Sequence, residues 1–183
     1  NDIATLLQQI PEKYHSRLVL HDHFDLAARY SVAGLHLNRR NPQPPTVYKG
    51  MTGRSCHSIE EVKNSTDVDY CFLSPIYDSI SKKGYTSHFS AEILTNACRE
   101  GIITERVFAL GGITPELLPQ LQEWGFGGAV MLGYLWKENT AGTAEIQAPG
   151  TEVPGSCRPA ETASTGRRGW KALVYGIISH AHS

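Results

Sequence analysis

Polar side chains that could do chemistry follow several short apolar runs of this sequence, at the points where those runs end. Asp22 follows the run 18–20, His57 follows the segment 51–56, and hydroxyls and lysines follow the run 70–73. Parallel α/β folds bind their ligands at the carboxyl ends of the strands. If these segments are strands, a carboxylate, a histidine, hydroxyls and lysines gather at one edge of the sheet.

Two further apolar runs, 107–110 and 128–131, each lead into a turn that contains glycine. Glycine lets a ligand approach the backbone, and a helix that starts at Thr114 would direct backbone N–H groups and its dipole at an anion. Successive turns of this kind match the phosphate site of a (β/α)₈ barrel, although ordinary βα turns also contain glycine. The turn residues are Gly111, Gly112, Leu132 and Gly133.

Each polar candidate also has a purely structural interpretation. A lone histidine such as His57 is more often structural than catalytic, and Lys82 and Lys83 taken alone are typical solvated surface charges. Their predicted place at the strand ends favours a function, but this inference rests on analogy with the architecture alone.

Six segments with strand character alternate with helices or loops along the chain. This alternation is typical of a parallel α/β sheet, and a spacing of about 20 to 30 residues per unit suits a (β/α)₈ TIM barrel. The predicted strands lie near 18–21, 34–37, 51–56, 70–74, 107–110 and 128–132. The predicted helices cover 2–14, 24–30, 90–102 and 114–124, and a further helix begins at Ser58.

The composition argues against several classes of function. The chain has 183 residues, a formal net charge of −1 and no basic run, which argues against nucleic acid as a partner. No apolar stretch approaches the ~20 residues that span a bilayer, and the polar amino terminus does not resemble a signal peptide. The cysteines show no CxxC spacing, so we expect free thiols in a cytoplasmic protein.

The last segment of the sequence differs in composition from the rest. Of the 46 residues in 138–183, 25 are Gly, Pro, Ser, Thr or Ala, and this composition cannot bury enough apolar surface to order most of the segment. We therefore expect two parts, a barrel domain over 1–137 and a low-complexity, disordered tail over 138–183.

Taken together and in order, the motifs of residues 2–137 resemble the thiamine phosphate synthase/TenI family. Each motif is weak alone, and their order and spacing make the resemblance specific. The family consists of phosphate-binding (β/α)₈ barrels of thiamine biosynthesis. The matching segments are 21–27 (HDHFDLA), 34–37 (GLHL), 54–61 (RSCHSIEE), 69–77 (DYCFLSPIY), 81–84 (SKKG), 109–113 (ALGGI) and 129–131 (AVM).

The resemblance implies a reaction and a set of roles. The synthase couples hydroxymethylpyrimidine diphosphate to thiazole phosphate and releases pyrophosphate, with Mg²⁺ neutralising the leaving group. Asp22 falls on a magnesium carboxylate of the family, and Lys82 falls on a phosphate-binding lysine assigned a catalytic role. The implied phosphate-binding residues are Ser79, Ser81 and Lys82 together with Gly111, Gly112, Leu132 and Gly133.

Two alternatives within this resemblance stay open. A TenI-type thiazole tautomerase moves a proton without metal, and His57 falls on its acid/base histidine, because imidazole titrates near neutrality. A non-catalytic protein that binds thiazole phosphate would keep only the glycine turns. The second magnesium carboxylate of the family is replaced by Asn41, which predicts weaker metal binding than in a standard synthase.

The resemblance also predicts an incomplete barrel. The family's first two strands, with their basic motif for the pyrimidine substrate, have no counterpart here, and the tail replaces the final helix. About six of the eight strands would then be present, and the open edges would favour oligomers and poor solubility. On this expectation, homo-oligomers form and the activity of the isolated chain is doubtful.

Overall fold

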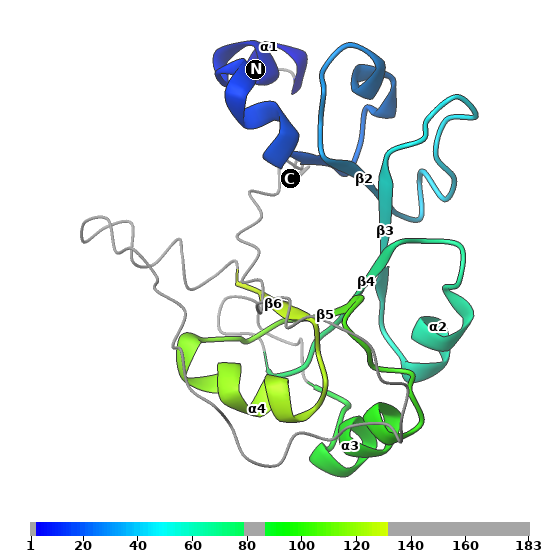
Figure 1. Cartoon of the computed structure of the whole chain (residues 1–183), viewed down its shortest axis with the longest axis vertical. Coiled ribbons are helices and arrows are strands. Elements are labelled where there is room, and N and C mark those ends of the chain that lie inside the picture. The colour runs from blue at the N-terminus through cyan, green and yellow to red at the C-terminus, as the bar shows by residue number, and fades with distance from the viewer. Residues whose placement is uncertain (1–2, 79–86, 132–183) are drawn as a thin grey trace, which may run out of the picture.

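Six parallel strands form a single sheet in the computed structural model, which describes residues 3–78 and 87–131 (Figure 1). Each strand pairs with the next one along the chain, so the spatial order is the sequence order, β1 to β6. The strands are β1 (Val19–Leu20), β2 (Gly34–Leu37), β3 (Met51–Cys56), β4 (Tyr70–Leu73), β5 (Val107–Leu110) and β6 (Gly128–Val130). The predicted strands are confirmed, with β1, β4 and β6 shorter than expected.

The sheet curls into part of a barrel, with α2, α3 and α4 outside the curve (Figure 1). Every adjacent pair of strands is parallel, and each crossover places its connecting helix or turn on the outer face. The described residues therefore form a half-barrel of the TIM-barrel kind, which confirms the predicted fold class with six of its strands.

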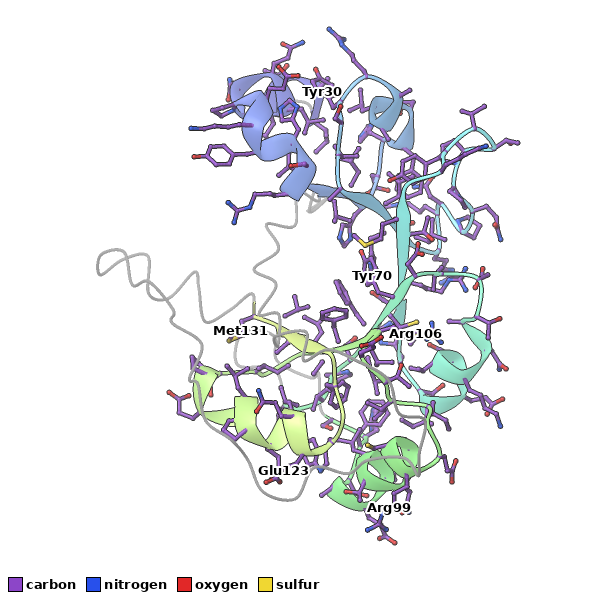
Figure 2. All side chains as sticks on the ribbon, viewed as in Figure 1. Tyr30, Tyr70, Arg99, Arg106, Glu123 and Met131 are labelled. Carbon is purple, nitrogen blue, oxygen red and sulfur yellow. The ribbon has the colours of Figure 1, made fainter. Side chains whose placement is uncertain are left out.

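The two faces of the sheet bury different side chains because successive residues of a strand alternate between them. Leu35, Leu73 and Val107 belong to the main core between the sheet and the helices. Tyr70 and Phe72 of β4 belong to a second apolar cluster, with Phe108 and Val130, on the concave side. Figure 2 shows Tyr70 on the inner side of the curve, whereas Arg99 points outward from α3.

The first helical segments are shorter than predicted. The helix expected over 2–14 is α1 (Ile3–Gln9) followed by the 3₁₀ turn η1 (Glu12–Arg17), because Pro11 cannot continue the α-helical hydrogen bonds. The helix expected over 24–30 is the 3₁₀ turn η2 (Phe24–Ala28). A segment this short gains few hydrogen bonds for the cost of helix nucleation.

The predicted start of a helix at Ser58 is confirmed, and a serine also caps the next helix. In α2 (Ile59–Asn64) the Ser58 hydroxyl accepts a hydrogen bond from the backbone N–H of Glu61 at 3.1 Å. In α3 (Ala91–Arg99) Ser90 caps Ile93 in the same way at 3.2 Å.

The helix after β5 begins differently from the prediction. It starts as the 3₁₀ turn η3 (Pro115–Leu117) and continues as α4 (Leu118–Glu123). Thr114 occupies the N-cap position, but its side chain makes no hydrogen bond that caps a backbone N–H. With so short and irregular a first turn, the helix dipole gives little support to an anion site.

Several predictions lie outside the described residues. Residues 79–86 and 132–183 include the whole predicted tail, so the two-part organisation stays a prediction. Within 3–78 and 87–131, no helix has the length and apolar character needed to cross a bilayer.

Candidate active site

The carboxyl ends of β1 and β2 bring a carboxylate, a guanidinium and an amide together. Asp22 follows β1, and Arg40 and Asn41 follow β2. One carboxylate oxygen of Asp22 accepts a hydrogen bond from Nη2 of Arg40 at 2.5 Å. The other oxygen accepts one from Nδ2 of Asn41 at 3.0 Å. Both oxygens of Asp22 are therefore bonded to nitrogen donors.

The side chain of Asn38 fixes the loop that carries these donors. Its Nδ2 donates a hydrogen bond to the carbonyl oxygen of His21, at the end of β1. Its Oδ1 accepts from the backbone N–H groups of Arg40 at 2.9 Å and Asn41 at 3.0 Å. One amide side chain thus joins two neighbouring strand ends and sets the position of the loop relative to Asp22.

These donors do not fit a resident magnesium ion. Mg²⁺ takes oxygen ligands in an octahedral arrangement, and Asp22 supplies the only carboxylate of this group. Its oxygens face a guanidinium and an amide N–H, which are groups that bind anions rather than cations. In the described part of the chain, no three His, Cys, Asp or Glu residues lie close enough together to hold a metal.

A buried histidine, His36 of β2, contacts side chains of the concave face. The Nδ1 of His36 lies 3.1 Å from the hydroxyl of Tyr70, and its Nε2 lies 2.9 Å from Oγ of Ser55. Its ring stacks on those of His21 and Phe72, with centroid distances of 4.4 and 4.6 Å. Side chains from four strands or strand ends therefore meet at His36.

Burial makes the imidazole of His36 a neutral group. His36 is 2% exposed, and desolvation followed by the nearby His21 lowers its pKa from 6.5 to about 3. A neutral imidazole has one N–H donor and one acceptor, so one neighbouring hydroxyl accepts a hydrogen bond while the other donates. His36 thus orients Tyr70 and Ser55 without carrying a charge.

Sequence reasoning placed His36, Ser55 and Tyr70 in motifs but not in the site. One signal was available, since a single histidine interrupts the apolar strand 34–37. Its partners depend on which residues of β3 and β4 face the same side of the sheet. That information comes from the register, in which His36 lies opposite Gly53 and Gly53 lies opposite Tyr70.

Gly53 makes room for the ring of Tyr70 on the concave face. A Cβ atom at this position would lie 2.0 to 2.4 Å from the nearest three ring atoms. Any other residue would therefore displace the ring, and with it the hydroxyl next to His36.

The imidazole of His57, which follows β3, is hydrogen-bonded to Ser74, which follows β4. Its Nδ1 lies 3.0 Å from the carbonyl oxygen of Ser74 and 3.4 Å from the Ser74 hydroxyl. Because a carbonyl only accepts, Nδ1 carries a proton, and Nε2 can act as the acceptor when the ring is neutral. The backbone N–H of His57 donates to Glu61 at 2.6 Å, which ties the residue to α2. This geometry suits a residue that exchanges protons through Nε2.

The backbone conformation and the close packing at Gly111 and Gly112 both favour glycine, which the sequence did not reveal. Both have positive φ, +99° and +64°. A Cβ at Gly111 would lie 2.9 Å from Pro75, and one at Gly112 would lie 2.4 Å from the backbone oxygen of Asp78. The space expected for a ligand beside these glycines is partly taken by the loop after β4, which hydrogen-bonds to Leu110 and Gly111. Their phosphate-binding role stays a prediction.

The structure therefore tests the geometry of only some of the predicted site residues. Asp22, His57, Gly111 and Gly112 all lie at the carboxyl ends of strands, as expected. The other candidates lie outside the described residues: Ser79, Ser81, Lys82, Leu132 and Gly133.

Comparison with known proteins identifies the family of this chain. The family described as thiamine monophosphate synthase matches residues 1–134. The chain belongs to this family. The resemblance inferred from the motifs is thereby confirmed over most of the chain.

Relatives of the family agree with this assignment. A thiamine-phosphate synthase of Synechococcus sp. (strain CC9605) is 32% identical over 149 residues, covering 77% of this chain and 41% of that protein. One from Halalkalibacterium halodurans is 26% identical, covering 78% and 71%. The crystal structure of a thiamine phosphate pyrophosphorylase from Bacteroides thetaiotaomicron is 47% identical with a TM-score of 0.65, covering 74% and 64%. The chain thus spans less than two thirds of the first relative and of this structure.

Proposed function

We propose that this chain belongs to a thiamine phosphate synthase, which couples hydroxymethylpyrimidine diphosphate to thiazole phosphate. In the proposed reaction, the CH₂–O bond of hydroxymethylpyrimidine diphosphate breaks and its electron pair leaves with pyrophosphate. The thiazole nitrogen then forms the new C–N bond with its lone pair. The observation that carries this proposal is the family match over 1–134, together with relatives that are named for this activity.

The polar groups of the site support the proposal from the residues upward. Ser55, which is half-buried and hydrogen-bonded to the neutral His36, offers a hydroxyl that suits an uncharged heterocycle better than a charged group. His57 places an acceptor nitrogen at the same edge of the sheet. The phosphate of the thiazole would bind at Gly111, Gly112, Leu132 and Gly133, and the diphosphate at Ser79, Ser81 and Lys82.

Magnesium enters this proposal only as an expectation from the family. If Mg²⁺ takes part, it would come with the phosphate oxygens of the substrate, because Asp22 alone offers one carboxylate that already accepts two hydrogen bonds. The proposed partners are the two small-molecule substrates, with neither nucleic acid nor membrane, in a cytoplasmic protein that can form homo-oligomers.

Ligand binding to the chain tests this proposal directly. Calorimetry should show saturable binding of thiazole phosphate and of hydroxymethylpyrimidine diphosphate, and a mixture should release pyrophosphate wherever turnover occurs. Binding of thiazole phosphate alone would favour a non-catalytic binding protein. Conversion of thiazole carboxylate phosphate without the pyrimidine would identify a tautomerase. Binding of neither compound would refute the proposal.

A further inference from the structure

The carboxyl ends of β1 and β2 carry a positively charged side chain, the guanidinium of Arg40. Arg40 lies where the family resemblance implies a metal, and its guanidinium pairs with Asp22 at 2.5 Å. We propose that Arg40 binds the diphosphate of the pyrimidine substrate and supplies the positive charge that a metal would otherwise provide there. This inference rests on the proposed function and assigns one residue to its diphosphate.

The loop presents Arg40 in a defined position. Asn38 accepts hydrogen bonds from the backbone N–H groups of Arg40 and Asn41 and donates one to His21, so the loop is tied to both strands. Asp22 then orients the guanidinium through one nitrogen. Arginine needs such an orientation for bidentate phosphate binding, because its planar fork matches phosphate oxygens only in a limited set of geometries.

The exposure of the two charges shows which of them a ligand would meet. The side chain of Arg40 is 71% exposed, whereas that of Asp22 is 21% exposed. The carboxylate is thus largely buried, whereas most of the Arg40 side chain is accessible from solvent. An incoming anion would meet this side chain before it met the negative charge of Asp22.

Asn41 determines the preference of this edge for an anion over a cation. Its Nδ2 donates to Asp22 at 3.0 Å, so its amide consumes a carboxylate lone pair that a metal would need. A carboxylate at this position would repel Asp22 and create a pair of oxygen ligands for a divalent cation. The neutral amide and the neighbouring guanidinium instead leave hydrogen-bond donors in excess.

A guanidinium at this edge would act on the leaving group. When the CH₂–O bond breaks, the diphosphate oxygen gains the electron pair, and charge-assisted hydrogen bonds from Arg40 would stabilise that charge. The thiazole nitrogen provides the electrons of the new bond, so the step requires no further reactant.

Titration with inorganic pyrophosphate tests the role of Arg40 apart from turnover. We would titrate the full chain by calorimetry in EDTA and again in MgCl₂, and compare Arg40→Gln with Arg39→Gln. Arg39 is an exposed arginine of the same loop, so its substitution removes the same charge one residue away. We expect Arg40→Gln to weaken pyrophosphate binding in EDTA about tenfold or more, and Arg39→Gln to change it less than about twofold.

A second variant reverses the proposed preference. Asn41→Asp should weaken pyrophosphate binding in EDTA and make it depend on Mg²⁺, because two carboxylates would then face each other. Arg40 is exposed and its surface ion pair contributes little to stability, so the variants should fold, which circular dichroism would verify.

Three results would overturn the inference. Pyrophosphate binding that requires Mg²⁺ and is equal in the wild type and Arg40→Gln would assign the charge to a metal, while leaving the proposed function intact. Absence of binding under both conditions, or equal losses in the two arginine variants, would also refute a specific role of Arg40. The proposed function would then be tested separately, by the binding of thiazole phosphate and by the release of pyrophosphate from the mixture of substrates.

Discussion

At the scale of single residues, the buried imidazole of His36 makes stability depend on pH. Its pKa is lowered to about 3 in the folded protein, from 6.5 for an unperturbed histidine. Between these values the unfolded chain binds a proton that the folded chain does not, so stability falls as the pH falls. The largest slope is about 1.4 kcal/mol per pH unit.

The measurement compares urea unfolding of the wild type and His36→Gln from pH 7 to pH 4. The variant is less stable at pH 7, because it loses the histidine's arrangement with Tyr70 and Ser55, but its stability should depend less steeply on pH. Burial also lowers the pKa of His21, which leaves part of the slope in both proteins. Parallel curves for the two proteins would show that His36 does not titrate as inferred.

Gly53 offers a second prediction at this scale. Gly53→Ala places a methyl group about where the ring of Tyr70 lies, and such overpacking costs about 1–3 kcal/mol. The test is a double-mutant cycle by urea unfolding with Tyr70→Ala. In the Tyr70→Ala background, the cost of the Gly53 substitution should largely disappear. An unchanged cost would mean that the ring of Tyr70 is not what requires glycine.

These residues show how far side-chain sites can be predicted from a sequence. Asp22 was placed at this edge because it follows an apolar run, and Asn41 was placed beside it by the family resemblance. Their hydrogen bond, and the ion pair with Arg40, depend on the path of the loop through Asn38, which no sequence pattern reports. His36 escaped notice because a buried strand is defined by its apolar residues, whereas its polar contacts depend on the register of its neighbours.

At the scale of elements, the turn after β5 is a place where the backbone itself requires glycine. Gly112→Ala would meet both a positive φ and the backbone oxygen of Asp78. Gly101 also has a positive φ of +70°, but no atom lies within 4 Å of its added Cβ. Gly101→Ala should therefore cost about 1–2 kcal/mol for the left-handed conformation alone.

Thermal melts of the two variants separate the cost of the left-handed backbone conformation from the cost of the steric clash with Asp78. Gly112→Ala should lower Tm clearly more than Gly101→Ala does. Equal losses would show that the loop after β4 yields easily. The phosphate-binding role inferred for Gly112 from the sequence stays a prediction. The structure adds another requirement for glycine here, the close packing of two backbone segments, because Gly112 and Asp78 are 34 residues apart in the sequence.

One arginine, which belongs to none of the sequence motifs, hydrogen-bonds the end of α2. Arg106 precedes β5 and donates hydrogen bonds to the carbonyl oxygens of Ser65 at 2.8 Å and Val62 at 3.3 Å. Arg106→Met would leave these carbonyls without that donor, at a cost of about 1–3 kcal/mol. Arg106→Lys is the matched control because it keeps the charge but loses the planar fork.

Urea unfolding measures the free energy of unfolding of each protein. We expect the wild type to be the most stable, Arg106→Lys to be intermediate and Arg106→Met to be the least stable. If both variants match the wild type, water replaces the lost donor and Arg106 is not needed to hold α2 against the sheet. Sequence patterns identified α2 through its cap at Ser58. They could not identify Arg106, because its partners precede it by about 40 residues.

At the scale of the whole molecule, the order of the strands predicts a gradient of stability across the sheet. Within the described residues, β3 and β4 pair on both sides, whereas β1 pairs only with β2 and through just two residues, Val19 and Leu20. Central strands share hydrogen bonds and apolar contacts with two neighbours, so they open only when most of the sheet unfolds. The parallel order was predictable from the alternation of elements, and β2, β3 and β5 have the predicted bounds, whereas β1, β4 and β6 are shorter than predicted.

Hydrogen exchange followed by mass spectrometry would measure this gradient. We expect amides of peptides covering β3 and β4 to exchange slowest, with protection near that of global unfolding. Peptides covering β1 should exchange much faster, since an exposed strand edge leaves part of the backbone unpaired. Strong protection of β1 would contradict this expectation and show that another strand covers the edge. Light scattering on the same sample would then decide whether a second copy of the chain provides it, because such pairing would double the mass of the particle.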